Sequence, residues 1–179
     1  MFGGLMRILG IDPGLTRCGV GIIDTDTRRQ STFVHVAVLS TPADSELPIR
    51  LHQLEQALEL LVDAYHPDVI AIERVFSQHN VRTAMGTAQA SAIAMLTATR
   101  RTIPVVMYTP TEVKAAVTGS GRANKDQVTA MVTRHLKLLS PPKPADAADA
   151  LALALCHSWK GAGQQRLNEA MTRAKVGQL

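Results

Sequence analysis

Residues 7–39 read RILGIDPGLTRCGVGIIDTDTRRQSTFVHVAVL, and this stretch decides the fold. Three apolar runs lie within it, at residues 7–12, 18–24 and 32–39, and turn-forming residues separate them. Short runs rich in Val and Ile between turns are typical of β-strands. Three strands joined by short links predict an antiparallel meander.

The spacing of apolar residues changes after this stretch. Leucine and valine recur at helical spacing between residues 48 and 65, which predicts an amphipathic helix. Strand-like runs then alternate with helical segments: strands at residues 69–73 and 104–108, and helices at residues 81–101, 110–117, 125–138 and 145–159. A meander followed by such alternation predicts an α/β fold, a mixed five-stranded sheet flanked by helices, which is the ribonuclease H-like arrangement.

The composition is that of one globular domain. The chain has 179 residues, of which 46% are hydrophobic and 19% are charged, which is enough to build one core. We expect a single domain over residues 6–160 and a polar, flexible tail over residues 161–179. Aromatic residues make up only 3%, which argues against a protein that binds single strands by stacking their bases.

No membrane or secretion signal is apparent in the sequence. No apolar run approaches the roughly 20 residues needed to cross a bilayer, and the N-terminus lacks the pattern of a signal peptide. Cys18 and Cys156 stand far apart, so they indicate neither a disulfide framework nor a zinc site. We therefore expect a cytoplasmic protein with reduced thiols.

Positive charge is concentrated in the middle of the chain. The net charge is +4 overall, but residues 1–73 carry −5 and residues 74–143 carry +8. A basic segment of this kind is typical of proteins that contact phosphates. The charges alone are equally compatible with a solvated surface that the acidic first part balances.

Two carboxylates stand at the ends of predicted strands. Asp12 ends the first strand before Pro13 and Gly14, where an aspartate often initiates a turn. Glu73 ends the strand of residues 69–73 and could equally be the first exposed residue after it. Because neighbouring strand ends form the usual crevice for chemistry in such sheets, the two carboxylates could converge there.

Two further carboxylates open the last predicted helix. Asp146 and Asp149 lie three residues apart and therefore share one face of this helix. Asp146 could simply cap the helix or interact with its dipole. Asp149 stands among alanines and leucines that we expect to be buried, and an unpaired carboxylate is costly there. It therefore requires a cation.

Gathered in one place, the four carboxylates would repel one another strongly unless a metal ion were bound. Oxygen donors without a neighbouring set of His or Cys favour Mg²⁺ or Mn²⁺ over zinc. Two such ions, about 3.5–4 Å apart, can activate water and stabilise the leaving oxygen during phosphodiester hydrolysis. The sequence thus predicts a two-metal hydrolytic site.

Several stretches occur together in one order: ILGIDPG at residues 8–14, IERVF at residues 72–76, Val113-Lys114 with Gly-Ser-Gly at residues 119–121, Lys125, and DAADALA at residues 146–152. In this order and spacing they resemble the RuvC family of Holliday-junction resolvases. The resemblance covers nearly the whole chain, from Met6 to His157.

This resemblance implies a homodimeric crossover junction endodeoxyribonuclease with a ribonuclease H-like fold. Such an enzyme makes two symmetric nicks across a four-way DNA junction in recombination and repair. The resemblance also implies Mg²⁺ as the cofactor, as two ions that Mn²⁺ could replace, and a RuvA–RuvB branch-migration complex as a partner. It assigns the metal to Asp12, Glu73, Asp146 and Asp149, although some family members carry His at the position of Asp146.

The resemblance further assigns roles outside the carboxylates. Lys114 and Lys125 match basic residues that contact or activate the scissile phosphate, and Phe76 matches an aromatic residue that stacks on a base at the junction centre. Solvent-facing lysines and a core phenylalanine are the simpler interpretations of these side chains. Arg82 and Arg122 are weaker candidates for contact with the DNA backbone.

Our candidate for the dimer interface is the Ala-rich helix predicted over residues 81–101. Its small residues would allow close approach, and Met85, Ile93, Met95 and Leu96 could be buried between two copies. Packing of this helix on its own sheet is the alternative.

Three other functions compete with the activity that the resemblance implies. A nuclease for RNA–DNA hybrids could employ the same four carboxylates, and a junction-binding protein without catalysis could share the basic segment. The carboxylates argue against the second rival. A sugar-kinase or actin-like ATPase would need a second domain that 179 residues cannot supply.

Overall fold

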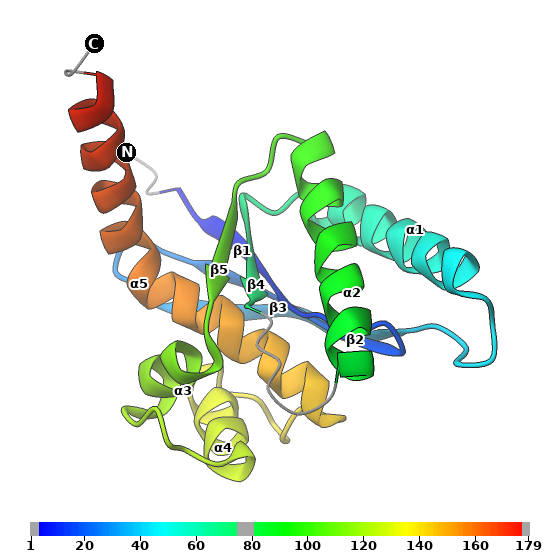
Figure 1. The fold of residues 1–179 in the computed structure, drawn as a ribbon. Helices are drawn as coiled ribbons and strands as arrows, with labels where there is room; N and C mark the ends of the chain where they lie inside the picture. Colours follow the sequence, from blue (N-terminus) through cyan, green and yellow to red (C-terminus); the bar gives the residue numbers. More distant parts are fainter. Residues whose placement is uncertain (1–3, 75–80, 177–179) are drawn as a thin grey trace.

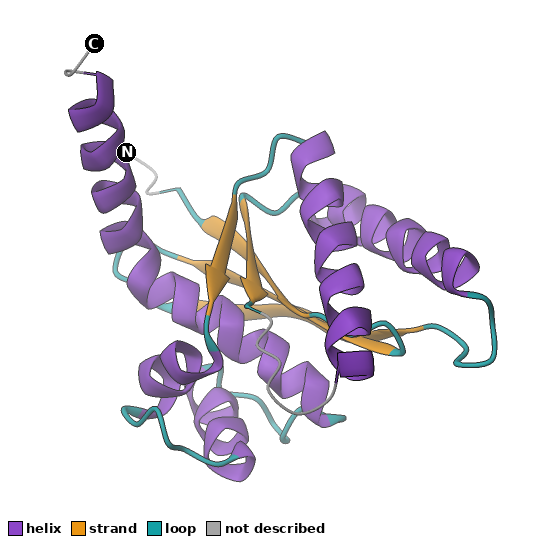
Figure 2. Ribbon diagram, viewed as in Figure 1, coloured by secondary structure: helices purple, strands orange, loops and turns teal. Residues whose placement is uncertain are grey.

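The computed structural model describes residues 4–74 and 81–176, with side chains over residues 4–74 and 83–161. Its strands form a single sheet in the order β3-β2-β1-β4-β5 (Figures 1 and 2). The strands are β1 (Met6–Asp12), β2 (Arg17–Thr25), β3 (Ser31–Ser40), β4 (Val69–Glu73) and β5 (Val105–Tyr108). β1, β2 and β3 pair antiparallel as the predicted meander, whereas β4 and β5 run parallel to β1 and to each other. The predicted mixed five-stranded sheet is confirmed.

Helices cover both faces of this sheet. On one face lie α1 (Leu47–Tyr65) and α2 (Val81–Arg100), and α5 (Ala145–Val176) crosses the other face. The short helices α3 (Pro110–Thr118) and α4 (Lys125–His135) pack on the outer side of α5 (Figure 1). No helix in the described part of the chain is long and apolar enough to cross a membrane.

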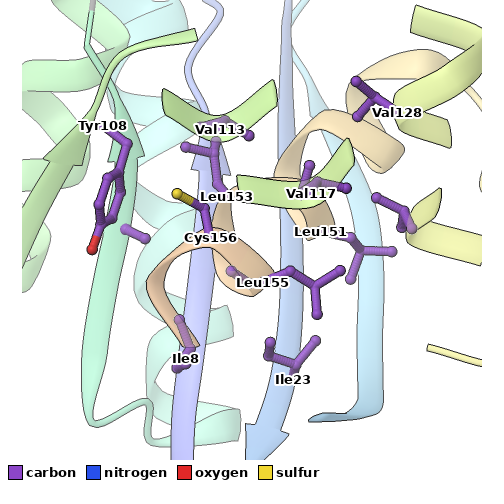
Figure 3. Close-up of a cluster of buried hydrophobic side chains, with 14 of the residues drawn as sticks. Ile8, Ile23, Tyr108, Val113, Val117, Val128, Leu151, Leu153, Leu155 and Cys156 are labelled. Carbon is purple, nitrogen blue, oxygen red and sulfur yellow. The ribbon is translucent and has the colours of Figure 1, made fainter. Parts of the chain in front are cut away.

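Alternating side chains divide the core into two layers. Along β1, Leu9 and Ile11 pack toward α1 and α2, whereas Ile8 packs toward α5. Figure 3 shows the layer on the α5 side, in which the sheet residues Ile8 and Ile23 meet Leu151 and the neighbouring apolar side chains of α5. Valines of α3 and α4 close this layer from outside. Because both faces are covered, the strands could be almost wholly apolar.

α5 lies directly on the backbone of β1 and β2, because three glycines leave room for it. Gly10 and Gly21 face each other across the two strands. A Cβ atom on Gly10 would lie 2.1 Å from the carbonyl oxygen of Ala150, and one on Gly21 would lie 2.8 Å from the amide nitrogen of Leu151. A Cβ atom on Gly19 would lie 2.1 Å from the carbonyl oxygen of Asp146. These glycines therefore set how deeply α5 sits on the sheet.

Two predicted helix ends are wrong. α4 ends at His135 rather than at residue 138, because Lys137 takes a left-handed backbone conformation with φ of 52° and turns the chain. α5 continues to Val176, beyond the predicted end at Trp159. The absence of an apolar stripe after residue 160 suggested a loose tail. The residues there include Ala, Gln, Leu, Glu, Arg and Lys, whose intrinsic helix propensity favours a helix even where no apolar face packs on the protein.

We expect Gly10→Ala to destabilise the protein by about 3 kcal/mol or more. The new methyl group would collide with backbone atoms of α5, which cannot move aside by a change of rotamer. The measurement is thermal unfolding followed by circular dichroism. Gly86→Ala in α2 is the matched control, because its nearest neighbour would be a side-chain carbon of Leu15 at 3.6 Å. An unchanged melting temperature for Gly10→Ala would contradict this account of the packing.

Candidate active site

The sheet brings Asp12 and Glu73 side by side. They are the last residues of β1 and β4, and the preceding residues Ile11 and Ile72 are partners in this parallel pair. Residues in step across parallel strands point to the same face. Gly10 and Ala71 lie one pleat earlier on that face, which α5 covers, so both carboxylates point to the side where α5 begins.

The first turn of α5 brings Asp146 and Asp149 over these strand ends. Asp12 pairs across the sheet with Gly19, and a Cβ atom on Gly19 would lie 3.2 Å from the Cβ of Asp146. Asp149 follows one helical turn later and therefore shares a face with Asp146. All four carboxylates predicted from the sequence thus meet at one end of the sheet. Because α5 packs closely on the glycines of β1 and β2, Asp146 and Asp149 lie beside Asp12 and Glu73.

Burial and mutual repulsion disfavour the ionised carboxylates. Burial, and then the charge of Glu73 beside it, raise the pKa of Asp12 to about 8. Burial and the charge of Asp149 raise the pKa of Glu73. Burial likewise raises the pKa of Asp149, and the charge of Asp146 adds to the effect. A group of acids that repel one another in this way is stabilised by a bound cation.

Two lysines approach the cluster from the short helices. Lys125 Nζ lies 3.5 Å from Asp149 Oδ2, and the charges of Lys125 and Lys114 offset part of the rise in the pKa of Glu73. Lys125 is the first residue of α4 and Lys114 stands in the middle of the nine-residue α3, and the N-terminus of each helix is held by a capping box, built on Thr109 in α3 and on Asn124 in α4. The caps fix where each helix begins, and so they fix where each lysine leaves the backbone.

Arg17 is a residue of the site that the sequence reasoning missed. It opens β2, and its Nη2 atom lies 2.5 Å from Asp146 Oδ2. Its side chain is 50% exposed, whereas that of Asp146 is 27% exposed. No motif singled out this arginine, since only the fold brings the start of β2 against the start of α5.

The donor set fits a hard divalent cation. The four carboxylates offer only oxygen atoms, and the buried Asp146 Oδ2 accepts no hydrogen bond from the described residues, although Arg17 Nη2 lies 2.5 Å from it. As the structure stands, no three His, Cys, Asp or Glu side chains within the described residues are grouped closely enough to hold a metal ion. Mg²⁺ usually keeps several waters and uses one or two carboxylates together with substrate phosphates, so an open arrangement suits it.

The remaining predicted site residues lie outside this cluster. Phe76 falls outside the described residues, and so does the side chain of Arg82. Arg122 is exposed in the loop between α3 and α4. Cys18 is fully buried near Asp12, and burial raises the pKa of its thiol to about 12, so it remains protonated.

Comparison with known proteins decides which family this site belongs to. The family model described as "Crossover junction endodeoxyribonuclease RuvC" matches residues 8–157. The chain belongs to the RuvC family. A relative of that name from Streptomyces avermitilis is 64% identical over 93% of this chain and 94% of its own length. Another, from Salinispora arenicola, is 60% identical over 96% of this chain and 98% of its own. As a RuvC-family member the chain is an endodeoxyribonuclease of crossover junctions.

Solved structures agree with this assignment. The structure of Thermus thermophilus RuvC superposes on the chain with a TM-score of 0.82, at 28% identity over 89% of this chain and 97% of that one. The complex of T. thermophilus RuvC with a Holliday junction substrate gives 0.83, at 29% identity over 87% and 94%. The yeast mitochondrial resolvase Ydc2, 13% identical, shares the fold with a TM-score of 0.63 over 93% of this chain and 86% of its own. The ribonuclease H-like fold predicted from the sequence is confirmed.

We expect the metal-free protein to lose stability as the pH rises from about 4 to about 8. The pKa of Asp12 is about 8 in the folded protein against 3.8 for a free aspartate, so folding favours its neutral form, and this contribution is lost as the group ionises. Asp12→Asn removes the ionisation. Its melting temperature in EDTA should therefore exceed that of the wild type more at pH 8 than at pH 5, by roughly 2–4 °C per kcal/mol of relieved repulsion.

The matched control is Asp44→Asn, which changes an exposed loop carboxylate far along the chain from the cluster. It should follow the wild type at both pH values. Equal pH dependence of the wild type and Asp12→Asn would show that Asp12 ionises freely in the folded protein.

Proposed function

We propose that the protein resolves four-way DNA junctions by metal-dependent phosphodiester hydrolysis at Asp12, Glu73, Asp146 and Asp149. The observation that carries this proposal is the convergence of four partly buried carboxylates at one end of the sheet in a chain of the RuvC family. The T. thermophilus relative bound to a Holliday junction substrate supports the choice of DNA. We further propose residues 6–160 as the nuclease domain and the bacterial cytoplasm, where such junctions arise, as its location.

The four carboxylates hold the metal in this mechanism. Bound Mg²⁺, as two ions that Mn²⁺ can replace, would supply an activated water and stabilise the leaving oxygen. Because Asp12 has a pKa of about 8 without metal, it gives up its proton as the site is loaded. Glu73 and Asp149 stand on opposite elements, one on the sheet and one on α5, so they can hold the loaded site from two sides.

Lys114 and Lys125 act on the phosphate. The charges of both lysines offset part of the rise in the pKa of Glu73 and of Asp149, so they reach the cluster, yet Lys125 keeps a side chain that is 73% exposed. An exposed ammonium group beside buried carboxylates can turn to the non-bridging oxygens of a bound phosphate. Phe76, Arg82 and Arg122 remain our candidates for the junction centre and the DNA backbone.

A second copy of the chain covers α2 in this proposal. Ala90, Ala94 and Ala98 of α2 are buried against its own sheet, and Ile93 and Met95 pack beside them. The opposite side of the helix carries an exposed apolar stripe of Met85, Ala88, Ala92 and Leu96, in which Met85 is 58% and Leu96 50% exposed. A C₂ dimer through this stripe would give two sites related as the two cuts in a junction are. We propose the RuvA–RuvB branch-migration complex as a partner at the same DNA.

Cleavage should require the metal and the carboxylates. A labelled synthetic four-way junction, incubated with and without Mg²⁺ and separated on a denaturing gel, should show paired nicks only with metal. Asp12→Asn, Glu73→Gln and Asp149→Asn should each lower the rate roughly 100-fold or more, because each disturbs metal placement. Asp126→Asn is the matched control, since this exposed carboxylate follows Lys125 in α4.

Substrates distinguish the proposed activity from its rival. An RNA–DNA hybrid of the same sequence should remain intact under conditions that cut the junction. Full cleavage in excess EDTA would remove the metal from the mechanism, and cleavage of the hybrid without the junction would favour a hybrid nuclease.

Ala92→Glu should weaken the dimer without unfolding the chain. Residue 92 is exposed in the middle of the apolar stripe, so a glutamate there remains solvated in the monomer but becomes buried between two copies. Sedimentation at micromolar concentration measures the effect, and Ala64→Glu, at an exposed position of α1, is the control. A dimer that persists in Ala92→Glu would move the interface to another surface.

A further inference from the structure

Arg17 has two different surroundings. On one side its guanidinium lies against Asp146 Oδ2, at 2.5 Å. On the other side it lines a surface groove between the turn after β1, residues 43–50 and the beginning of α2. The side chain is half exposed, so rotation about its outer bonds would carry the guanidinium from the carboxylate toward the groove.

The groove offers a second guanidinium and no carboxylate among the described residues that line it. Arg50 lies in the groove, where its Nε donates to Thr41 Oγ1 at 2.9 Å and its Nη2 donates to Thr16 Oγ1 at 2.7 Å. These bonds fix the plane of Arg50 but leave its remaining N–H groups available to a ligand. The groove begins at Gly14, in the turn that follows Asp12, and at Arg17, the first residue of β2, so it adjoins the carboxylate cluster.

Asp146 Oδ2 cannot pair with Arg17 and bind a divalent cation at the same time. A guanidinium carries one positive charge, and a half-exposed ion pair of this kind contributes little. A divalent cation shared by several carboxylates therefore displaces it. Once displaced, Arg17 becomes a free guanidinium beside Arg50, and arginines bind phosphate through paired hydrogen bonds.

We propose that Arg17 is a positioning residue that holds Asp146 in place of the divalent cation until metal binds, and that it then turns into the groove to bind, with Arg50, a phosphate of the DNA strand that enters the site. The inference rests on the proposed metal site and DNA substrate. It makes metal loading and tight binding of the strand depend on each other, because one side chain takes part in both.

Metal binding without DNA tests the first half of the proposal. Titration of Mn²⁺ into the apo protein by isothermal calorimetry should give a dissociation constant about 2- to 5-fold lower for Arg17→Gln than for the wild type, because the competitor is gone. Arg17→Lys keeps the charge and should stay close to the wild type. Arg50→Gln lies in the same groove but does not touch Asp146, so it should leave Mn²⁺ binding unchanged.

Junction binding tests the second half. Fluorescence anisotropy with a labelled four-way junction is measured in EDTA and again in Ca²⁺, with the DNA checked for integrity on a denaturing gel. Arg17→Gln should weaken binding about 2- to 5-fold in Ca²⁺ and hardly at all in EDTA, where Asp146 still holds Arg17 in the wild type. Arg50→Gln should weaken binding similarly in both.

The possible results distinguish failure of either role of Arg17 from failure of the proposed metal site. Equal Mn²⁺ affinity of the wild type and Arg17→Gln, or weaker affinity in the variant, overturns the role of Arg17 at Asp146. Tighter Mn²⁺ binding together with unchanged junction binding in Ca²⁺ overturns its role in the groove. If the wild-type protein itself binds no Mn²⁺, the proposed metal site fails instead, and that outcome is recognisable because all variants share it.

Discussion

The contact of α5 with the backbone of β1 and β2 is the constraint on which the rest of the structure depends. Gly10, Gly19 and Gly21 leave no side chain between helix and strands, so the first turn of α5 reaches the ends of the strands. A helix held at the usual distance by larger side chains would carry Asp146 and Asp149 away from Asp12. The same contact builds one layer of the core, in which Leu151 and its neighbours meet the sheet. The same contact between α5 and the sheet therefore determines both the packing of the core and the geometry of the site.

Bringing the four carboxylates together is electrostatically unfavourable, and neighbouring basic side chains offset only part of that effect. Three of the four carboxylates have raised pKa values, and burial is the largest cause each time. Lys125 and Arg17 each neutralise one carboxylate of α5, while Asp12 and Glu73 have no basic side chain in contact among the described residues. A site that lacks charge balance in this way is destabilised without its cation and binds it correspondingly well. Under the proposed function, this local loss of stability is what lets the four carboxylates hold a divalent metal at a defined place.

The basic side chains around the cluster come from elements that are far apart in the sequence. Lys114 and Lys125 leave helices whose starts are held by capping boxes, whereas Arg17 leaves the first residue of a strand. The lysines come from α3 and α4, where Lys125 contacts Asp149, whereas Arg17 contacts Asp146 and lines the groove that Arg50 also lines. A DNA strand that crosses the carboxylates would therefore meet positive charge from both groups. The two lysines belong to the basic middle of the chain, whereas Arg17 and Arg50 come from its acidic first part.

The sequence by itself determined the order and type of the helices and strands, because the spacing of apolar residues follows from the period of the helix or strand itself and not from the way the elements pack together. It also drew attention to Asp12 and Glu73, which end apolar strands, and to Asp146 and Asp149, which open an apolar helix, and the resemblance to the RuvC family assigned all four to the metal. It failed at the end of α5, where helix propensity acts without an apolar stripe, and at the end of α4, where one left-handed residue turns the chain. Only the tertiary structure decided that Gly10, Gly19 and Gly21 lie beneath α5 and that Arg17 contacts Asp146, because both depend on distances between segments more than 120 residues apart, which no local pattern encodes.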